Sequence, residues 1–278
     1  MNIERFDKSE SVLAKQYFDE FGFVIIKNGI DKPTLNDFKQ ELLRIIRAYL
    51  SKANISEEIS DEQILHKGME LLEDSDHMFV ASIYDTISLS PAFLRIVSSG
   101  LIEKFVCSLL EKPDAPLYGY TNRCLIAPPF DTVRTYDWHQ EVFYTVPRGS
   151  FIQTWAPLIS DTSVSNGTIQ VAIGSHREGI AKQTWTEIDG RASYPMIDDE
   201  IIAKYDQLSV EMKLGELMLF SGYLAHRSGT NSSDKHRYSL VGMYHDVSTQ
   251  EFIAPSVDLN HRGQTPEEYF NSHFEKIV

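Results

Sequence analysis

The chain has 278 residues, of which 42% are hydrophobic and 24% charged, as in an ordinary globular protein. Its formal net charge of -14 makes nucleic acid and anionic membranes poor candidate partners, because an acidic surface repels phosphate groups. No apolar run is long enough to span a bilayer, and the charged N-terminus lacks the apolar core of a signal peptide, so we expect a cytoplasmic protein. Cys107 and Cys124 are expected to be reduced thiols, and no pattern indicates an oligomeric state.

The first third of the chain shows helical patterns. Gly22 marks the end of a first amphipathic segment, and Asp31 and Pro33 favour the start of a second, in which apolar residues recur at steps of three and four. Ser90-Pro91 is typical of another helix start. Helices are therefore expected at residues 11–21, from residue 31 onwards, at 61–74 and at 90–111, with a short buried strand at 23–26.

From residue 117 the pattern changes to short β-type runs separated by turn residues such as Asn166-Gly167. The expected strands cover residues 118–126, 141–146, 152–158, 168–173, 208–212, 216–220 and 238–245. Many short strands at regular spacing indicate a sandwich or barrel. Thr265-Pro266 predicts the start of a short helix near the C-terminus.

These elements predict one domain with a mainly β fold. We expect a helical N-terminal layer in residues 1–116 and a β-jelly-roll core, cupin-like in architecture, in residues 117–246. Residues 247–278 form a C-terminal extension of the same domain.

The segment Trp138-His139-Gln140-Glu141 carries the first candidate metal ligands. In a strand, residues two positions apart face the same side, so His139 and Glu141 could present an imidazole and a carboxylate to one point. His226, which follows an apolar strand and precedes a polar turn, is the best candidate for a third ligand. Two histidines and one carboxylate form the facial arrangement of non-haem iron(II) oxygenases, although zinc tolerates the same ligands.

Arg237, eleven residues after His226, favours iron over zinc. A 2-oxoglutarate cosubstrate has a distal carboxylate that must be anchored away from the metal, and the planar fork of arginine binds a carboxylate well. Arg237 begins a predicted strand that we expect to pair with, or lie near, the strand of His226. Ser228 could add a hydroxyl donor to the same carboxylate.

The order of these motifs resembles the phytanoyl-CoA dioxygenase (PhyH) family. The similar features are the run WHQE, the run NGTIQVAIGSH at residues 166–176, and His-x-Ser with an arginine eleven residues later. Residues 18–38, FDEFGFVIIKNGIDKPTLNDF, are similar to the helix, strand and helix that open that family. The resemblance extends from about residue 18 to residue 244, and it implies a double-stranded β-helix, iron(II), 2-oxoglutarate, dioxygen and hydroxylation of a small molecule.

The resemblance also implies roles for single residues. His139, Glu141 and His226 match the iron ligands, and Arg237 and Ser228 match the anchors of 2-oxoglutarate. Trp155 lies near a position that lines the cosubstrate site in some members. The family usually has aspartate where this chain has Glu141, and a carboxylate there argues against a halogenase.

Other polar residues near these motifs have simpler interpretations. His176 could be a rival ligand, but we prefer a structural role in fixing its loop. Asn122 and Arg123 lie on the strand before the metal motif, and one of them could line the pocket. Arg134 and Arg148 flank the motif and are more simply solvated or ion-paired.

The function predicted from the sequence is an iron(II)/2-oxoglutarate-dependent dioxygenase that hydroxylates an unactivated C–H bond of a small-molecule metabolite, with release of succinate and carbon dioxide. One alternative is a cupin-like zinc or manganese isomerase or hydrolase, which would need the ligands but not Arg237. Another is a non-catalytic jelly-roll binding protein, in which the three ligands are incidental.

Overall fold

The computed structural model describes residues 3–56, 59–131, 135–143, 151–186, 194–250 and 252. Its helices are α1 (Ser11–Phe21), α2 (Lys32–Lys52), α3 (Asp61–Gln63), α4 (Met69–Ser75), α5 (His77–Ser88), α6 (Pro91–Val97), α7 (Gly100–Leu109) and α8 (Asp199–Ile202). Its strands are β1 (Phe23–Ile26), β2 (Leu117–Ala127), β3 (Phe151–Pro157), β4 (Ile169–Ala172), β5 (Gln183–Thr186), β6 (Tyr194–Ile197), β7 (Gln207–Ser209), β8 (Leu217–Ser221), β9 (His226–Ser228) and β10 (Arg237–Asp246).

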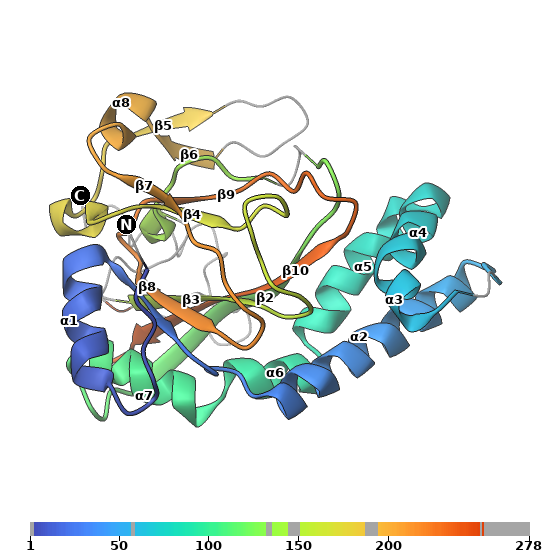
Figure 1. The fold of residues 1–278 in the computed structure, drawn as a ribbon, viewed down its shortest axis with the longest axis horizontal. Helices are drawn as coiled ribbons and strands as arrows, with labels where there is room; N and C mark the ends of the chain where they lie inside the picture. The colour runs from blue at the N-terminus through green and yellow to red at the C-terminus, as the bar shows by residue number, and fades with distance from the viewer. Residues whose placement is uncertain are drawn as a thin grey trace, which may run out of the picture.

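Two antiparallel sheets face each other and form the jelly-roll. The major sheet has the order β1-β8-β3-β10-β2, and the minor sheet has the order β7-β4-β9. Helices α2, α6 and α7 lie along one face of the major sheet, and the minor sheet lies beyond the other face (Figure 1). The predicted fold class, a jelly-roll with a helical N-terminal layer, is confirmed. The division of this single domain into parts at residues 116 and 246 stays a prediction.

The chain enters the sheet through a helix stop and a strand that the sequence predicts. Gly22 ends α1 in a left-handed conformation, with φ of 86°, and its N–H donates to the Phe18 carbonyl at 2.7 Å. All four residues of β1 are buried, and β1 pairs with β8. Asp31 caps α2 by accepting a hydrogen bond from the Thr34 N–H at 2.8 Å.

The structure differs from the sequence-based expectation at several elements. The predicted helix at 90–111 is two helices, because the Ser99 side chain caps a new start at α7 by accepting from the Ile102 N–H. Helix α5, capped by Asp76, and strands β5, β6 and β9 were not predicted. The predicted strand at 141–146 is wrong for Glu141–Phe143, which form a 3-10 turn. The rest of that run and the expected helix at Thr265-Pro266 lie outside the described residues.

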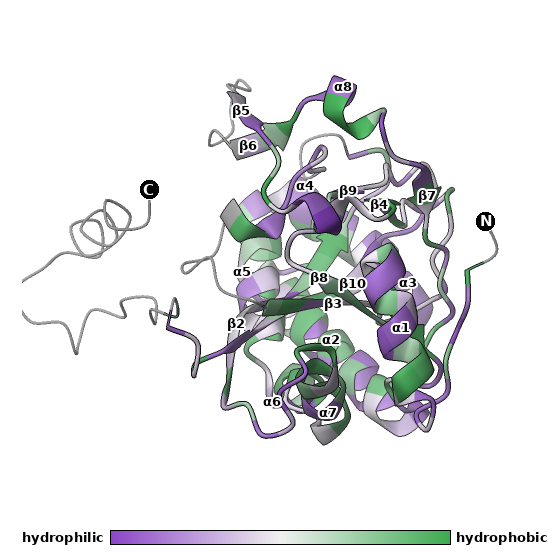
Figure 2. Cartoon of the chain, turned by 90° about the vertical axis from the view of Figure 1, so that its left-hand side faces the viewer, coloured by the Kyte–Doolittle hydropathy of each residue, from purple (hydrophilic) through white to green (hydrophobic). Residues whose placement is uncertain are grey.

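The core follows the hydropathy of the strands and of the inner helix faces. Figure 2 shows β3 and β8 as apolar strands in the middle of the molecule, with helices beneath them. Every residue of β3 is buried, and in β8 only the final serine is partly exposed. Among the described residues, no helix combines the length and the hydropathy that crossing a bilayer requires.

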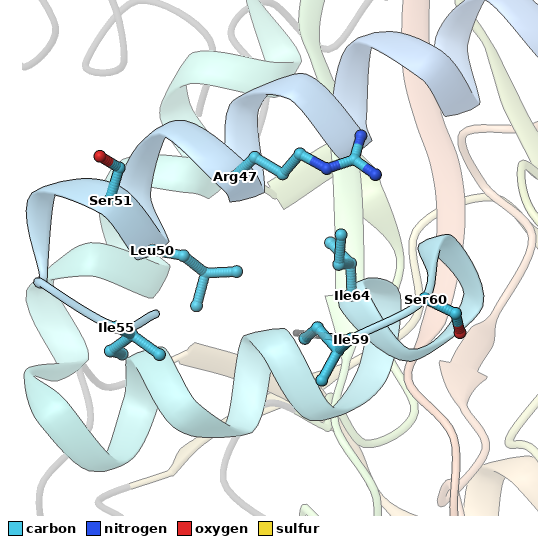
Figure 3. Close-up of a pocket in the computed structure, with 7 residues that line it drawn as sticks. All are labelled: Arg47, Leu50, Ser51, Ile55, Ile59, Ser60 and Ile64. Atoms are coloured by element: carbon cyan, nitrogen blue, oxygen red, sulfur yellow. The ribbon is translucent and has the colours of Figure 1, made fainter. Parts of the chain in front are cut away.

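A hollow of about 570 Å³ lies in the helical layer, between the C-terminal half of α2 and the segment that follows it (Figure 3). Its walls include the apolar side chains of Leu50, Ile55 and Ile64. Arg47 also lines it and forms an ion pair with Asp61. The hollow shares no lining residue with the cavity between the sheets.

The Asn166-Gly167 turn supports a prediction about stability. Gly167 has φ of 77°, and a Cβ there would lie 2.4 Å from the Gly229 carbonyl oxygen, which is backbone and cannot move aside cheaply. Gly167→Ala should therefore lower the free energy of unfolding by about 2 kcal/mol or more in urea denaturation. Gly100→Ala is the matched control, because a Cβ there meets nothing within 4 Å. Equal stability of the two variants would contradict this account of the turn.

Candidate metal centre and cosubstrate cavity

Three side chains from two distant segments meet between the sheets. His139, Glu141 and His226 each offer one ligand atom, and these atoms lie within 4.8 Å of one another. Nε2 of His139 and Nε2 of His226 lie 3.7 Å and 3.9 Å from the same oxygen, Oε2 of Glu141. In the part of the chain that the structure describes, this is the one cluster of three or more such groups that could hold a metal.

A short antiparallel bridge between backbones holds the two histidines side by side. The His139 N–H donates to the His226 carbonyl at 3.0 Å, and the His226 N–H donates to the His139 carbonyl at 3.0 Å. His226 begins β9 and is paired on its other side with Val171 of β4. The two imidazole centroids are 4.3 Å apart. The backbone therefore fixes both rings before any metal is bound.

The hydrogen bonds of the two imidazoles select the tautomer that a metal needs. Nδ1 of His139 lies 2.7 Å from the Asp137 carbonyl oxygen, and Nδ1 of His226 lies 2.9 Å from the Leu224 carbonyl oxygen. A carbonyl oxygen can only accept, so each Nδ1 carries a proton, and in the neutral form of each ring Nε2 is the nitrogen with the lone pair. Such outer partners are typical of metal-bound histidines.

His226 is held in its neutral form as well as in this tautomer. Burial, with the nearby His139 as a second cause, lowers the pKa of His226 well below its ordinary value. A neutral imidazole is the form that binds metals. The donor set of two imidazoles and one carboxylate fits iron(II).

Gln140 anchors the segment that carries two of the three ligands. Its Nε2 donates to the Gly179 carbonyl at 2.8 Å and to the Tyr223 carbonyl at 2.6 Å, and its Oε1 accepts from the Ala181 N–H at 2.9 Å. These bonds tie the His139–Glu141 segment to two other loops. The Gln140 side chain is thus fully used in positioning and is buried.

Arg237 supplies a buried cation that lacks a counterion in the described structure. It is 6% exposed, and its Nε and Nη1 atoms have no hydrogen-bond partner. Burial lowers the pKa of Arg237 to about 10, so the guanidinium remains charged at neutral pH. An unpaired buried charge is costly, which indicates that an anion completes this site.

One cavity of about 260 Å³ contains all six residues that the sequence singles out. His139, Glu141 and His226 line it together with Arg237, Ser228 and Trp155. Groups that could bind a metal and a group that could bind a carboxylate therefore open onto the same space. A keto-diacid that binds a metal at one end and a guanidinium at the other fits this arrangement.

Comparison with known proteins identifies the family. The phytanoyl-CoA dioxygenase (PhyH) family matches residues 18–239 of this chain. The chain belongs to the phytanoyl-CoA dioxygenase family. The resemblance seen in the sequence is confirmed, and membership places the chain among the non-haem iron and 2-oxoglutarate-dependent enzymes.

Two curated relatives share parts of this sequence. A phytanoyl-CoA dioxygenase domain-containing protein 1 homolog from Dictyostelium discoideum is 31% identical over 85 residues, which cover 29% of this chain and 30% of that protein. The peroxisomal phytanoyl-CoA dioxygenase of Bos taurus is 21% identical over 255 residues, which cover 86% of this chain and 69% of that protein.

Solved structures of similar fold support the jelly-roll assignment. The epimerase SnoN, in complex with Fe3+, alpha ketoglutarate and nogalamycin RO, gives a TM-score of 0.60 at 16% identity, with 93% of each chain covered. The carbocyclase SnoK from nogalamycin biosynthesis gives 0.57 at 17% identity, covering 88% of this chain and 87% of that one. The non-heme monooxygenase ThoJ gives 0.56 at 23% identity, covering 84% and 78%.

The structure corrects how the family motif brings its residues together. His139 and Glu141 do not share a strand face, because Glu141 begins a 3-10 turn. The strands that carry His226 and Arg237 do not pair, since β9 pairs with β4 and β10 pairs with β2 and β3, but they lie near each other, as the second of the two expected arrangements requires. The two residues meet instead across the space between the sheets.

Two further residues escaped the sequence analysis. Ser239 is fully buried, and its Oγ has no partner in the described structure. It lies two positions after Arg237 on β10, so strand alternation could have placed it on the same face. No local sequence pattern marks Gln140 as a positioning residue, because its hydrogen-bond partners Gly179, Ala181 and Tyr223 lie far along the chain.

His176, the rival ligand, lies outside the metal cluster. Its Nε2 is 3.2 Å from the Asp19 carbonyl oxygen, and its Nδ1 would lie 2.5 Å from a Cβ at Gly22. It therefore packs against the end of α1, as its predicted structural role requires. Arg123 lines the cavity, whereas Arg134 and Arg148 lie outside the described residues.

The anchoring role of Gln140 leads to a second prediction. Gln140→Leu removes one hydrogen bond from each of two carbonyls and one N–H, and we expect it to lower the free energy of unfolding by about 3 kcal/mol in urea denaturation. Gln183→Leu is the control, because both amide atoms of Gln183 lack partners already. A loss in Gln140→Leu no greater than in the control would contradict the anchoring role.

Proposed function

We propose that this protein uses iron(II), 2-oxoglutarate and dioxygen to hydroxylate an unactivated C–H bond of a small-molecule metabolite. The observation that carries the proposal is a His-Glu-His cluster that shares one cavity with a buried, unpaired arginine. The family of the chain supports the same chemistry.

In this proposal, His139, Glu141 and His226 would hold the iron. Iron and 2-oxoglutarate together supply the oxidation: one atom of dioxygen enters the substrate as a hydroxyl group, the other enters succinate, and carbon dioxide leaves. The two Nδ1–H···O=C bonds keep both imidazoles aimed at the metal.

Arg237 binds the distal carboxylate of 2-oxoglutarate, and the Ser228 hydroxyl adds a donor. Ser239 lies on the face of β10 that carries Arg237, and its free hydroxyl is available to the same anion. The Trp155 side chain, which is 4% exposed, forms a wall of the cavity and excludes water.

Arg237 also discriminates against the alternatives. A zinc or manganese hydrolase or isomerase needs the three ligands but gives no reason to bury a guanidinium without a counterion beside them. A binding protein with an incidental triad gives no reason for both histidines to share one tautomer. The cavity therefore favours the 2-oxoglutarate-dependent oxygenase.

Arg237→Leu should weaken 2-oxoglutarate binding by roughly 10- to 100-fold, because a charge-assisted contact of about 1.5–3 kcal/mol is lost. Titration calorimetry on protein loaded with manganese(II) under nitrogen measures this, and manganese affinity should stay within about twofold. The exposed Arg95, which faces Asp37, gives the control variant Arg95→Leu. If Arg237→Leu bound 2-oxoglutarate as tightly as the wild type, Arg237 would not be the anchor of its distal carboxylate.

Glu141→Ala should lower the iron content of anaerobically reconstituted protein to a small fraction of one equivalent, because the carboxylate is the one anionic ligand of the set. Glu111→Ala, at an exposed position just after the C-terminal end of α7, is the control and should retain iron. The metal content of both variants, measured by mass spectrometry, decides the point. If both variants held the same amount of iron, Glu141 would not be an iron ligand.

The hydroxylation itself is tested by product analysis. With substrate pools, iron(II), 2-oxoglutarate and ¹⁸O₂, we expect succinate to form and one labelled oxygen atom to appear in the product. A product that lacks the label, with succinate still formed, would exclude hydroxylation and retain an oxygenase-type enzyme.

The predicted cytoplasmic location stays a prediction.

A further inference from the structure

A second polar side chain is buried in the metal cavity without partners. Gln153 on β3 is 0% exposed, and neither its Nε2 nor its Oε1 has a hydrogen-bond partner in the described structure. It lines the same cavity as the His-Glu-His cluster. Neither the metal ligands nor the predicted anchors of 2-oxoglutarate account for it.

Gln153 lies at the opposite end of the cavity from the arginine anchor. In the β3–β10 ladder, Gln153 is opposite Met243, whereas the Arg237 end of β10 runs towards Ser239 and Pro157 of that ladder. On its other side Gln153 is opposite Phe220, whose ring lies 5.0 Å from that of His226. The amide is therefore near the metal but away from the site of the distal carboxylate.

Burying an amide without partners costs free energy that a leucine or methionine at the same place would avoid. The buried Gln140 shows the usual solution, because its amide bonds to backbone groups of the protein. An amide offers a donor and an acceptor side by side. Its natural complement is a neutral group that also has both, such as a carboxamide or a lactam.

A cation marks the side of the cavity formed by β2. Arg123 lines the cavity and is exposed, and within the described ranges no carboxylate forms an ion pair with it. A β-bulge sits beside it, because the register between β2 and β10 shifts between Val241 and Met243. Bulges often re-aim side chains next to active sites.

Of the three arginines that line the cavity, Arg123 is the one that remains available for a substrate. Arg237 faces the distal carboxylate of the cosubstrate in the function proposed above. Arg227 already donates to Gln170 at 2.5 Å and lies over the Trp138 ring at 4.7 Å. Arg123 is thus the cation of the cavity that has neither role.

We propose that Gln153 and Arg123 form the substrate subsite, which takes a small organic anion bearing an amide or lactam group. The proposal rests on the function proposed above, because it assigns the space that iron and 2-oxoglutarate leave. Gln153 orients the neutral group by a paired donor and acceptor, and Arg123 binds the anionic group. Apolar walls from Val241, Met243 and Phe220 hold the carbon skeleton between them.

The test uses three matched probes with protein loaded with manganese(II) and saturating 2-oxoglutarate. 5-Oxoproline has a lactam and a carboxylate, its lactone analogue lacks the N–H donor, and 2-pyrrolidinone lacks the carboxylate. Paramagnetic broadening of the probe signals in NMR reports binding near the metal. We expect 5-oxoproline to bind about tenfold more tightly than either of the other probes.

Two variants separate the two contacts. Gln153→Leu should weaken 5-oxoproline about tenfold and abolish the preference for lactam over lactone. Arg123→Leu should abolish the preference for 5-oxoproline over 2-pyrrolidinone and keep the lactam preference. Gln183→Leu, another partnerless glutamine that lies outside this cavity, and Arg95→Leu should behave as the wild type.

The midpoint of thermal unfolding gives a second test. A substitution of Gln153 should raise it if the amide serves a ligand, and should lower it if the amide serves the fold. Gln153→Met replaces the unpaired amide by an apolar chain of similar shape, and the unfolding midpoint should rise by roughly 2–4 °C. A fall of the midpoint together with unchanged probe binding would overturn the proposal.

Two failures are distinguishable. If the wild type binds manganese(II) and 2-oxoglutarate but does not bind 5-oxoproline, or binds all three probes equally, the subsite proposal is wrong and the proposed function stands. If 2-oxoglutarate itself does not bind to the metal-loaded protein, the proposed function fails first.

Discussion

The whole site depends on the pair of backbone hydrogen bonds between His139 and His226. These two N–H···O=C bonds join a loop before the 3-10 turn to the first residue of β9. Because β9 is paired in turn with β4, the two candidate histidine ligands are tied to the minor sheet. Glu141 then needs only the short turn after His139 to bring its carboxylate to both imidazoles.

The cavity around this bridge contains polar groups whose partners are not part of the protein. Arg237 on β10 and Gln153 on the neighbouring strand line it towards opposite ends, and Ser239 lies on the same face of β10 as Arg237, two positions further along, without lining the cavity. Each is buried, so each carries a cost that the folded chain alone does not offset. Such costs are typical of sites shaped for ligands. In the functions proposed above, the cosubstrate and the substrate would therefore bind at separate polar ends of one cavity.

Local sequence signals predict local structure well in this chain. The glycine that ends α1, the aspartate that caps α2 and the apolar run of β1 all behave as expected. The sequence pattern does not predict helix α5. It also does not predict the break between α6 and α7, because Ser99 is an inconspicuous cap within an otherwise continuous apolar pattern. Capping and periodicity are short-range effects, so they are legible without tertiary contacts.

The site was predictable by residue type and order, but not by geometry. The order of His139, Glu141, His226 and Arg237 is a family pattern, and the chain belongs to that family. The strand argument that placed two of these residues on one face is wrong, because long-range contacts of Gln140 hold a turn there. Gln153 was not singled out, since only the assembled sheets reveal that its amide has no partner.

The central claim is that one metal and one keto-diacid bind together between the His-Glu-His cluster and Arg237. An anaerobic titration of the iron(II)-loaded protein with 2-oxoglutarate, followed by visible absorption, tests this most directly. The account predicts a charge-transfer band that saturates at one equivalent of 2-oxoglutarate, because the band requires chelation of iron by the keto acid. Absence of the band in protein that holds one equivalent of iron would contradict the account.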